Sequence, residues 1–260
     1  MYWAVMLAAL LVASEPLCAG AWTIPHGTLQ VFSGAVSSHA HQRYDGTGKL
    51  VGPVFFNKLY FQNWMEYGLT DAFTLIAAPQ YITAKSSNDK GLLQRFSSPS
   101  LEAGGKLLLS RRFGMLSLQA TAKAAGGFDM SVSSSGESGR QIELRLLYGA
   151  NFKLFQRDGF IDLEAGQRWI QRPRPDEMVL DASMGWWLTR RNLILLQSFT
   201  AISGKGPRWP YEPYCQVKLE GSMVHRFTPR WALQSGYFIT AAGRNTVKEN
   251  GMVTTLWFRL

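Results

Sequence analysis

Residues 101–124, which read LEAGGKLLLSRRFGMLSLQATAKA, contain two segments of alternating polarity on either side of a short turn. In the first segment, Leu101 to Leu109, small or apolar residues occupy the odd positions, and in the second, 115–124, they occupy the even positions. Because successive side chains of a β-strand point to opposite faces, each segment predicts a strand with one apolar and one polar face. The stretch therefore predicts an antiparallel hairpin that turns at 111–114.

The same kind of segment recurs along the rest of the chain. We count twelve segments of roughly 10–14 residues with alternating or continuous apolar character, and we find no strong helical periodicity. Their length suits membrane β-strands, which need about 9–11 residues when tilted near 45°. The segments are 28–37, 54–67, 73–84, 99–110, 115–126, 140–153, 159–171, 177–188, 193–202, 213–226, 231–241 and 250–260.

The connections between these segments fall into two classes that alternate along the chain. Short turns on one side and longer loops on the other are typical of an up-and-down outer-membrane barrel, whereas a soluble sandwich with crossing connections is not expected to alternate. The sequence therefore predicts an all-β fold, a single up-and-down antiparallel transmembrane β-barrel of about 12 strands. The tight connections are 68–71, 111–114, 156–159, 189–192 and 227–230, and the long ones are 38–53, 85–98, 127–139, 172–176, 203–212 and 242–249.

The start of the chain indicates the compartment. Residues 3–13 form an uncharged apolar run, which Glu15 and then a stretch of small residues at 19–21 follow. This order resembles a secretory signal peptide with its cleavage site in that small-residue stretch, although no Lys or Arg precedes the apolar run. The run is too short to span a membrane as a helix; a buried N-terminal helix is the alternative. We expect a signal peptide over 1–21, an outer-membrane β-barrel over 22–260, and export through the periplasm.

Composition and net charge do not distinguish a membrane barrel from a soluble β-protein. Of the 260 residues, 17% are charged and 13% are aromatic, and 25 are glycine. Such a composition suits a barrel wall that faces lipid, but it also suits a soluble β-sandwich, so a soluble periplasmic β-protein is the rival fold. The net charge of +9 becomes +10 when the expected leader takes Glu15 with it. Cys215 is then the only cysteine, so no internal disulfide can form.

Aromatic residues gather near the ends of the expected strands. Trp and Tyr favour membrane–water interfaces because they combine an apolar body with a polar edge, so we expect two girdles; ordinary core aromatics are the alternative. The girdle near the tight turns contains Trp64, Tyr67, Phe73, Phe113, Phe155, Phe160, Trp186, Trp187, Phe227, Trp231 and Phe258, and the girdle near the long loops contains Phe55, Tyr81, Trp169, Trp209, Tyr211 and Tyr214.

The last ten residues, GMVTTLWFRL at 251–260, resemble the terminal strand of Gram-negative outer-membrane barrels. Met252, Leu256, Phe258 and Leu260 alternate on one face. In that family the final strand is read by the barrel-insertion machinery, and the usual last residue is Phe, from which Leu260 departs. The resemblance implies an outer-membrane barrel and makes the insertion machinery an expected partner.

Residues 66–75, EYGLTDAFTL, are similar to a strand-turn-strand unit found in barrels grouped with the MetA pathway of phenol degradation. Those barrels are of comparable size and are associated with transport. The turn motif itself is generic, and only residues 66–75 support the resemblance to this group. The resemblance to outer-membrane barrels in general covers essentially the whole chain after the expected leader. The resemblance to this group implies a transport role.

Charged residues share the face opposite the apolar one on the strands that alternate clearly. If the apolar face meets lipid, these charges point into the lumen, where they need water or partners because isolated buried charges are costly. A tight turn at 111–114 places Glu102 opposite Lys123, and a compatible register brings Glu143 to Arg168. The lumen-facing candidates are Glu102, Lys106, Lys123, Glu143, Arg145, Asp162, Glu164, Arg168, Asp181, Lys218 and Glu220, together with Arg259.

Two functions fit such a lumen. Its charges can filter small polar or ionic solutes, or they can neutralise one another and fill the bore. A barrel of eight strands has space only for side chains, whereas one of sixteen strands encloses an aqueous channel. The strand number of twelve lies between these and does not show whether the lumen is open or filled. We expect a channel or transporter for small polar or hydrophobic solutes; the alternative is a closed structural or surface-interaction barrel.

An outer-membrane lipid hydrolase is a third hypothesis. Some twelve-stranded barrels are phospholipases with a His and a Ser two residues apart and a nearby Asn, but this chain has no His-x-Ser and no Gly-x-Ser-x-Gly. His39 and His41 have no further ligand nearby in the sequence, so they favour a solvated loop over a metal site. We therefore expect no catalytic residue, no metal and no cofactor.

Basic residues follow the turns and loops and do not form one stripe, which argues against nucleic acid as a partner. Bases in the outer loops are suited to phosphates of outer-membrane lipid and lipopolysaccharide. They are Lys85, Lys90, Arg95, Arg172, Arg174, Lys205, Arg208, Arg244 and Lys248.

Overall fold

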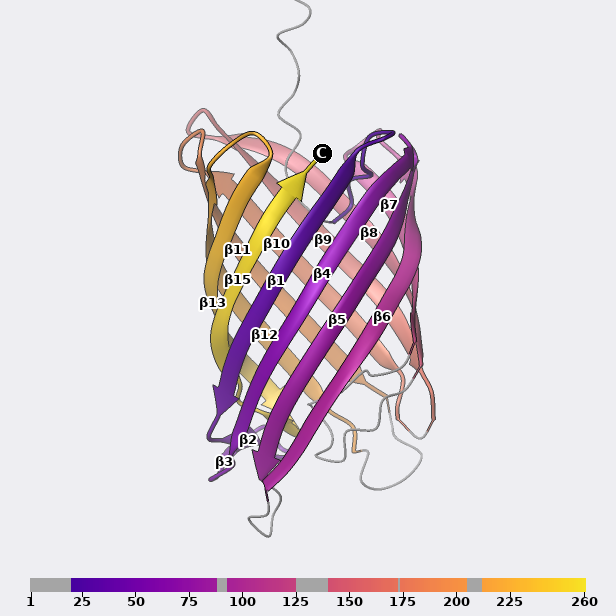
Figure 1. The fold of residues 1–260 in the computed structure, drawn as a ribbon. Helices are drawn as coiled ribbons and strands as arrows, with labels where there is room; N and C mark the ends of the chain where they lie inside the picture. The colour runs from indigo at the N-terminus through magenta and orange to yellow at the C-terminus, as the bar shows by residue number, and fades with distance from the viewer. Residues whose placement is uncertain (1–19, 88–92, 125–139, 173, 205–211) are drawn as a thin grey trace, which may run out of the picture.

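A computed structural model describes residues 20–87, 93–124, 140–172, 174–204 and 212–260, so most of the expected signal peptide lies outside the described residues. Twelve strands form one closed antiparallel barrel in which each strand pairs with its neighbours along the chain (Figure 1). The all-β, twelve-stranded up-and-down barrel predicted from the sequence is confirmed. Its strands are β1 (Leu29–Ala40), β4 (Phe56–Thr70), β5 (Phe73–Ser87), β6 (Leu93–Ser110), β7 (Met115–Ala124), β8 (Gln141–Leu154), β9 (Arg157–Ile170), β10 (Glu177–Trp187), β11 (Asn192–Ser203), β12 (Cys215–Arg226), β13 (Trp231–Arg244) and β15 (Asn250–Arg259).

The barrel closes where the first strand meets the last. β1 pairs with β15 from Gln30 opposite Arg259 to His39 opposite Asn250, and with β4 on its other side. Closure leaves no strand edge with unpaired backbone groups, which is the condition for a sheet to sit in lipid. No helix in the described part of the chain is long and apolar enough to cross a membrane.

Large apolar side chains cover the outside of the barrel. On β8 the outward residues Ile142 and Leu146 are 59% and 48% exposed, and Met252 on β15 is 67% exposed. In water this surface would be unfavourable by about 25 cal/mol per Å² of apolar area, and it is far more extensive than the patches of soluble monomers. The outer wall is therefore a lipid-facing surface. Other members are Leu101, Leu107, Leu144, Leu163, Leu180, Leu196, Leu219, Met223, Tyr237 and Ile239.

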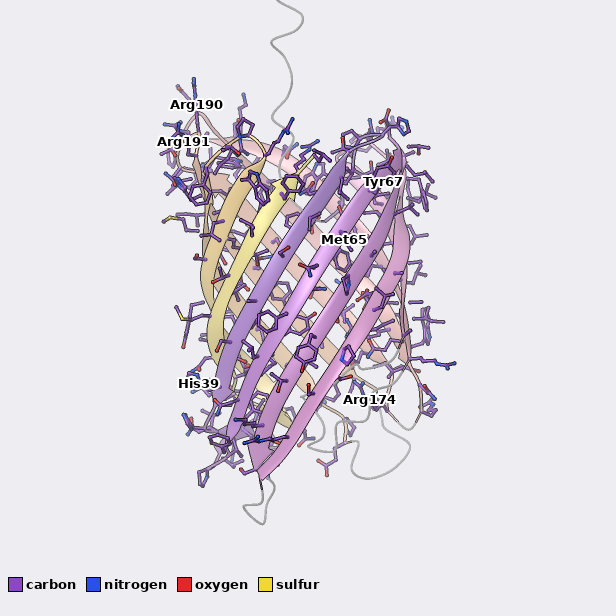
Figure 2. All side chains as sticks on the ribbon, viewed as in Figure 1. His39, Met65, Tyr67, Arg174, Arg190 and Arg191 are labelled. Carbon is purple, nitrogen blue, oxygen red and sulfur yellow. The ribbon has the colours of Figure 1, made fainter. Side chains whose placement is uncertain are left out.

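The two ends of the barrel differ. The end with the short connections, here called the turn end, also carries the C-terminus (Figure 1). Arg190 and Arg191 lie at the turn end, whereas His39 lies toward the opposite end, here called the loop end (Figure 2). The sequence placed His39 in the first loop, but this prediction was wrong, because β1 continues to Ala40 and His39 is a strand residue.

A small second sheet, which the sequence did not predict, lies at the loop end. β2 (Arg43–Tyr44) pairs with β3 (Leu50–Val51) and with β14 (Thr246–Val247), joining the long connections predicted at 38–53 and 242–249. Val247 packs against the buried residues Ala40, Phe56 and Ala84 of the barrel wall. The last long loop therefore folds against the inner wall at this end.

Residues 20–27, here called the inner segment, enter the lumen at the turn end. The Ala21 N–H donates to Asp162 Oδ1 (2.8 Å), and the Ile24 N–H donates to Thr74 Oγ1 (2.8 Å). Ser117 Oγ donates to the Ala21 carbonyl (2.6 Å). These partners come from β9, β5 and β7, so the inner segment is bonded to several separate strands. It narrows the turn end of the lumen.

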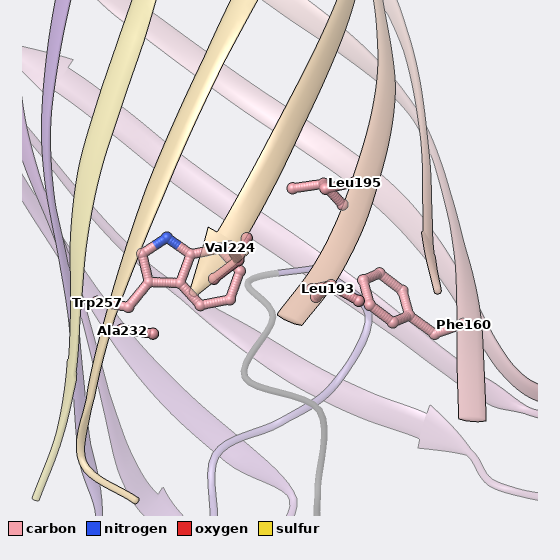
Figure 3. Packing of buried hydrophobic residues seen from close by; sticks show 6 residues of the cluster. All are labelled: Phe160, Leu193, Leu195, Val224, Ala232 and Trp257. Atoms are coloured by element: carbon pink, nitrogen blue, oxygen red, sulfur yellow. The ribbon is translucent and has the colours of Figure 1, made fainter. Parts of the chain in front are cut away.

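The main apolar cluster also lies inside the barrel, near the turn end. Phe160, Leu193, Leu195, Val224, Ala232 and Trp257 form it (Figure 3), and Trp22, Phe32 and Trp187 pack against it. The Trp22 and Phe160 rings meet edge to face at 5.8 Å between centroids, a favoured aromatic geometry. The inner segment is thus held by apolar packing as well as by hydrogen bonds.

Candidate functional site

The candidate site is the lumen, which contains a polar cavity of about 500 Å³. Strands β4 to β11 supply most of its wall, and Gly20 of the inner segment contributes at one end. Seven carboxylates and four basic side chains line it, so negative charge is in excess. The charged lining residues are Glu66, Glu102, Lys123, Glu143, Arg145, Asp162, Glu164, Arg168, Arg174, Glu177 and Asp181.

Arg145 is the centre of the charge network on this wall. Its Nη1 donates to Glu164 Oε2 (2.8 Å) and to Asp181 Oδ2 (2.5 Å), and its Nε pairs with Glu143. Arg145 lies opposite Gly166 in β9, and a Cβ on that glycine would lie 2.6 Å from Arg145 Cγ. The missing side chain lets the guanidinium cross β9 and reach Asp181 on β10.

Arg168 extends the network toward the loop end. It contacts Glu143 Oε2 and Glu177 Oε2, both at 2.6 Å, and the predicted register of Glu143 opposite Arg168 is correct. Arg174 Nη2 lies 3.6 Å from Glu177, and the Tyr214 hydroxyl donates to the same carboxylate. Charge-assisted hydrogen bonds of this kind hold side chains in fixed positions. This part of the wall is therefore ordered.

The predicted residues on β6 and β7 lie on the same wall but bind different partners. Glu102 is opposite Lys123 as predicted, yet Lys123 Nζ donates to Gln80 Oε1 (2.7 Å). Lys106 is fully buried, and its Nζ contacts Glu66 Oε1 (3.0 Å).

The remaining candidates, Lys218 and Glu220, lie on β12. Lys218 Nζ lies 2.6 Å from Glu249, which also pairs with Lys58 and accepts a hydrogen bond from Ser38 at 2.5 Å. Glu220 instead accepts hydrogen bonds from Ser222 and Gln234. Arg259, the last lumen candidate, is opposite Gln30 in β1.

A second cavity of about 250 Å³ has a mainly uncharged lining. It shares Tyr60, Gln62 and Trp64 with the polar cavity, so the two are neighbouring parts of one lumen. We call it the aromatic cavity; its lining includes Phe32, Val36, Phe160, Leu195, Val253 and Trp257. The lumen therefore has a charged wall on one side and an aromatic wall on the other.

Several residues were assigned wrongly from the sequence. Trp64 and Phe160 line the lumen cavities, and Trp187 packs on the cluster inside the barrel, so none belongs to an outer girdle. Tyr214 is buried against Glu177. Arg174, predicted in an outer loop, is only 4% exposed and lies at the ion network. Trp209 and Tyr211 lie outside the described residues.

Other functional side chains were missed altogether. Glu66, Glu177, Glu249 and Lys58 were not among the candidates, although each forms a buried or nearly buried ion pair. Glu66 and Lys58 stand on even positions of β4, the same parity as Trp64. That parity was the available signal, but Asn57 and Asn63 on the outer face, with Phe56, Tyr60 and Trp64 on the lumen face, concealed it.

His39 lies on the outer face of the barrel wall and not in the lumen. Ser37 and His39 share the outward face of β1, and His39 is flanked by Asn57 and Asn250 in the neighbouring strands. Among the described residues no hydrogen bond joins Ser37 to His39. The described residues also contain no group of three His, Cys, Asp or Glu placed to hold a metal ion.

Comparison with solved structures identifies this architecture. An outer membrane channel of the COG4313 group from Pseudomonas putida F1 superimposes with a TM-score of 0.72 at 16% identity, covering 92% of this chain and 97% of that one. The translocator domain of the autotransporter NalP from Neisseria meningitidis gives 0.57 at 13% identity, covering 99% and 94%. The β domain of the Bordetella autotransporter BrkA gives 0.51 at 10% identity, covering 90% and 98%. No protein-family model and no curated protein matches the chain.

At these identities the likeness establishes the fold. The chain has the fold of these outer-membrane barrels, and its apolar outer wall is suited to a membrane, so the predicted fold is confirmed. None of these comparisons tests the resemblance of residues 66–75 to the MetA-pathway group, which rests on the sequence alone.

Proposed function

We propose that this barrel is a channel for small solutes that combine a polar or charged group with an apolar part. The observation that carries the proposal is the lumen itself, a cavity of about 500 Å³ with a charged wall that adjoins an aromatic cavity of about 250 Å³. Solute sites in proteins typically have this size and combine apolar surface with a few fixed polar groups. Such a lumen offers both halves of an amphipathic molecule a matching wall.

The fixed ion network supports an open channel for solutes over a lumen filled by side chains. Arg145 and Arg168 hold their carboxylates against one wall, so the charges do not extend across the bore. The open volume remains beside them. A closed structural barrel would instead be expected to fill this volume with interdigitated side chains, as small barrels do.

The inner segment supplies a restriction within this path. Trp22 packs on Phe160 and on Gly149, where a Cβ would lie 2.7 Å from the indole. A solute that travels the full length of the lumen has to pass this point. We take the turn end to be periplasmic, because short turns face the periplasm in barrels of this kind.

Membrane partners follow from the same orientation. The outward residues Met252, Leu256 and Phe258 of β15 are the proposed signal for the insertion machinery. Exposed bases at the loop end, such as Lys85 and Arg95, are placed to meet lipopolysaccharide phosphates. We propose that the protein is not an enzyme.

The test is solute permeation through proteoliposomes that contain the purified barrel. Matched solutes should be compared, one polar and one carrying an added aromatic ring on the same head group. The aromatic solute is expected to enter at least as fast as the smaller polar one, in spite of its size. Permeation no faster than in empty liposomes for both solutes would contradict the channel and favour the closed barrel.

A further inference from the structure

Gly20 and Ala21, which the sequence assigns to the leader, form buried contacts in the folded barrel. Lys106 Nζ donates to the Gly20 carbonyl (2.6 Å), and the Ala21 N–H donates to Asp162 (2.8 Å). Ser117 Oγ donates to the Ala21 carbonyl (2.6 Å). Each bond satisfies a polar group in the barrel wall that is at most 3% exposed. Removing these two residues would leave three buried groups without these partners, which is unfavourable.

The backbone of Gly20 lies directly against a carboxylate. A Cβ on Gly20 would lie 2.6 Å from Asp162 Oδ1 and 2.8 Å from Oδ2, and φ is +143°, so glycine fits this position and other residues do not. Asp162 is 3% exposed and shares the lumen face of β9 with Glu164. The backbone of Gly20 therefore lies very close to a pair of neighbouring carboxyl groups, Asp162 and Glu164.

The charges around Asp162 favour an additional cation. Lys106 Nζ is already shared between Glu66 (3.0 Å) and the Gly20 carbonyl, and Arg145 is bound to Glu143, Glu164 and Asp181. The bond from Ala21 to Asp162 comes from an uncharged amide. A buried carboxylate is stabilised far more by a cation than by an amide donor.

We propose that the leader is cleaved between Ala19 and Gly20, and that the new α-ammonium of Gly20 pairs with Asp162 to anchor the inner segment. The step is a hydrolysis: water adds across the Ala19–Gly20 peptide bond, giving a carboxylate on Ala19 and an amine on Gly20 that takes up a proton. A leader peptidase of the export pathway performs it before the barrel folds. The inference rests on the expected leader and does not depend on channel activity.

This boundary lies two residues before the one expected from the sequence. A small residue precedes the cleaved bond in both cases, but the A-x-A pattern of leader cleavage is complete only before the later cut, at Ala19-Gly20-Ala21, whereas the earlier cut has Leu17 in the third position before the bond. The contacts of Gly20 and Ala21 distinguish them, since only cleavage after Ala19 keeps all three hydrogen bonds.

The test begins with the wild-type chain, produced with its leader in a Gram-negative host and purified from the outer membrane in mild detergent. Intact mass and N-terminal sequencing are expected to give a chain that begins at Gly20. A chain that begins at Trp22, or one that keeps residues 1–19, would overturn the proposal.

The ion pair is tested by acylation of the terminal amine in the folded protein. Asp162→Asn is expected to raise the labelling rate at least tenfold, whereas the matched control Ser117→Ala, which removes an uncharged bond to the same segment, should change it less than threefold. Equal rates in wild type and D162N would overturn the pairing. The wild-type mass result stands even if D162N fails to fold.

Discussion

Arg145 on β8 and Asp181 on β10 form an ion pair of 2.5 Å across an intervening strand. Gly166 of β9 lies opposite Arg145, and its lack of a side chain leaves the path between them open. One arginine thereby joins three adjacent strands on the lumen face. The charged wall depends on this arrangement.

Replacing Arg145 with Gln should destabilise the barrel by about 3–5 kcal/mol, because three carboxylates lose their shared cation inside the lumen. Gly166→Ala should act in the same direction by displacing the guanidinium. The free energy of unfolding in urea, measured in lipid vesicles, checks both. Arg190→Gln at an exposed turn is the control and should change it by less than about 0.5 kcal/mol. Unchanged stability of both lumen variants would show that the network is not formed.

The channel should prefer cations, since carboxylates outnumber bases in the polar cavity even when Lys106 is counted against Glu66. The reversal potential in a KCl gradient measures this preference. The double variant Glu164→Gln, Asp181→Asn should reduce it, while Asp158→Asn at the exposed turn end should not. Anion preference in the wild type would contradict the charge count.

A charge on the outer wall should be costly at mid-membrane and tolerated at the edge. Leu146 lies near the middle of β8 on its outward face, and Leu154, also outward, is the last residue of that strand. Leu146→Arg should cost about 2–4 kcal/mol and Leu154→Arg about 0–1 kcal/mol in lipid vesicles. Equal small effects would indicate an outer surface that faces water.

Glu249 should keep its ion pairs through mild acid. It lies between β14 and β15, where burial raises its pKa, but Lys58 and Lys218 outweigh burial and hold the pKa of this carboxyl well below 4.5. A depressed pKa contributes stability that is fully present above the unfolded value and is lost as pH falls through the folded value. The melting temperature of wild type should therefore exceed that of Glu249→Gln by a constant amount from pH 7 to about 5, and the gap should close only below about pH 4. A gap that closes near pH 6 would contradict this assignment.

The sequence predicted the barrel well where the lumen face is polar. On β8 and β9 polar and apolar residues alternate along most of each strand, so parity placed Glu143 and Arg168 on the lumen face, and a compatible turn between the strands gave their register. On β1, β4 and β11 polar and apolar residues are mixed on both faces, because the lumen side carries Phe32, Trp64 and Leu195 of the aromatic cavity and the outer side carries polar residues such as Asn57 and Asn63 of β4. Alternation is weak on these strands for that reason, and lumen aromatics were mistaken for an outer girdle.

Features that depend on distant contacts were not predictable from the pattern. The inner segment is fixed by Asp162, Ser117 and Thr74, which are 50 or more residues away in the chain. The reach of Arg145 depends on the absence of a side chain at Gly166. Neither feature leaves a local signal in polarity or spacing.

Single-channel conductance in planar bilayers shows whether the lumen is a path that the inner segment restricts. Trp22→Ala removes the indole that packs on Phe160, and Trp186→Ala removes an outward-facing indole at the same end as its control. Wild type should give discrete steps, W22A steps at least twice as large, and W186A steps like those of wild type. Silence in all three proteins would show that the lumen is closed, and equal steps in W22A and wild type would show that the inner segment does not restrict it.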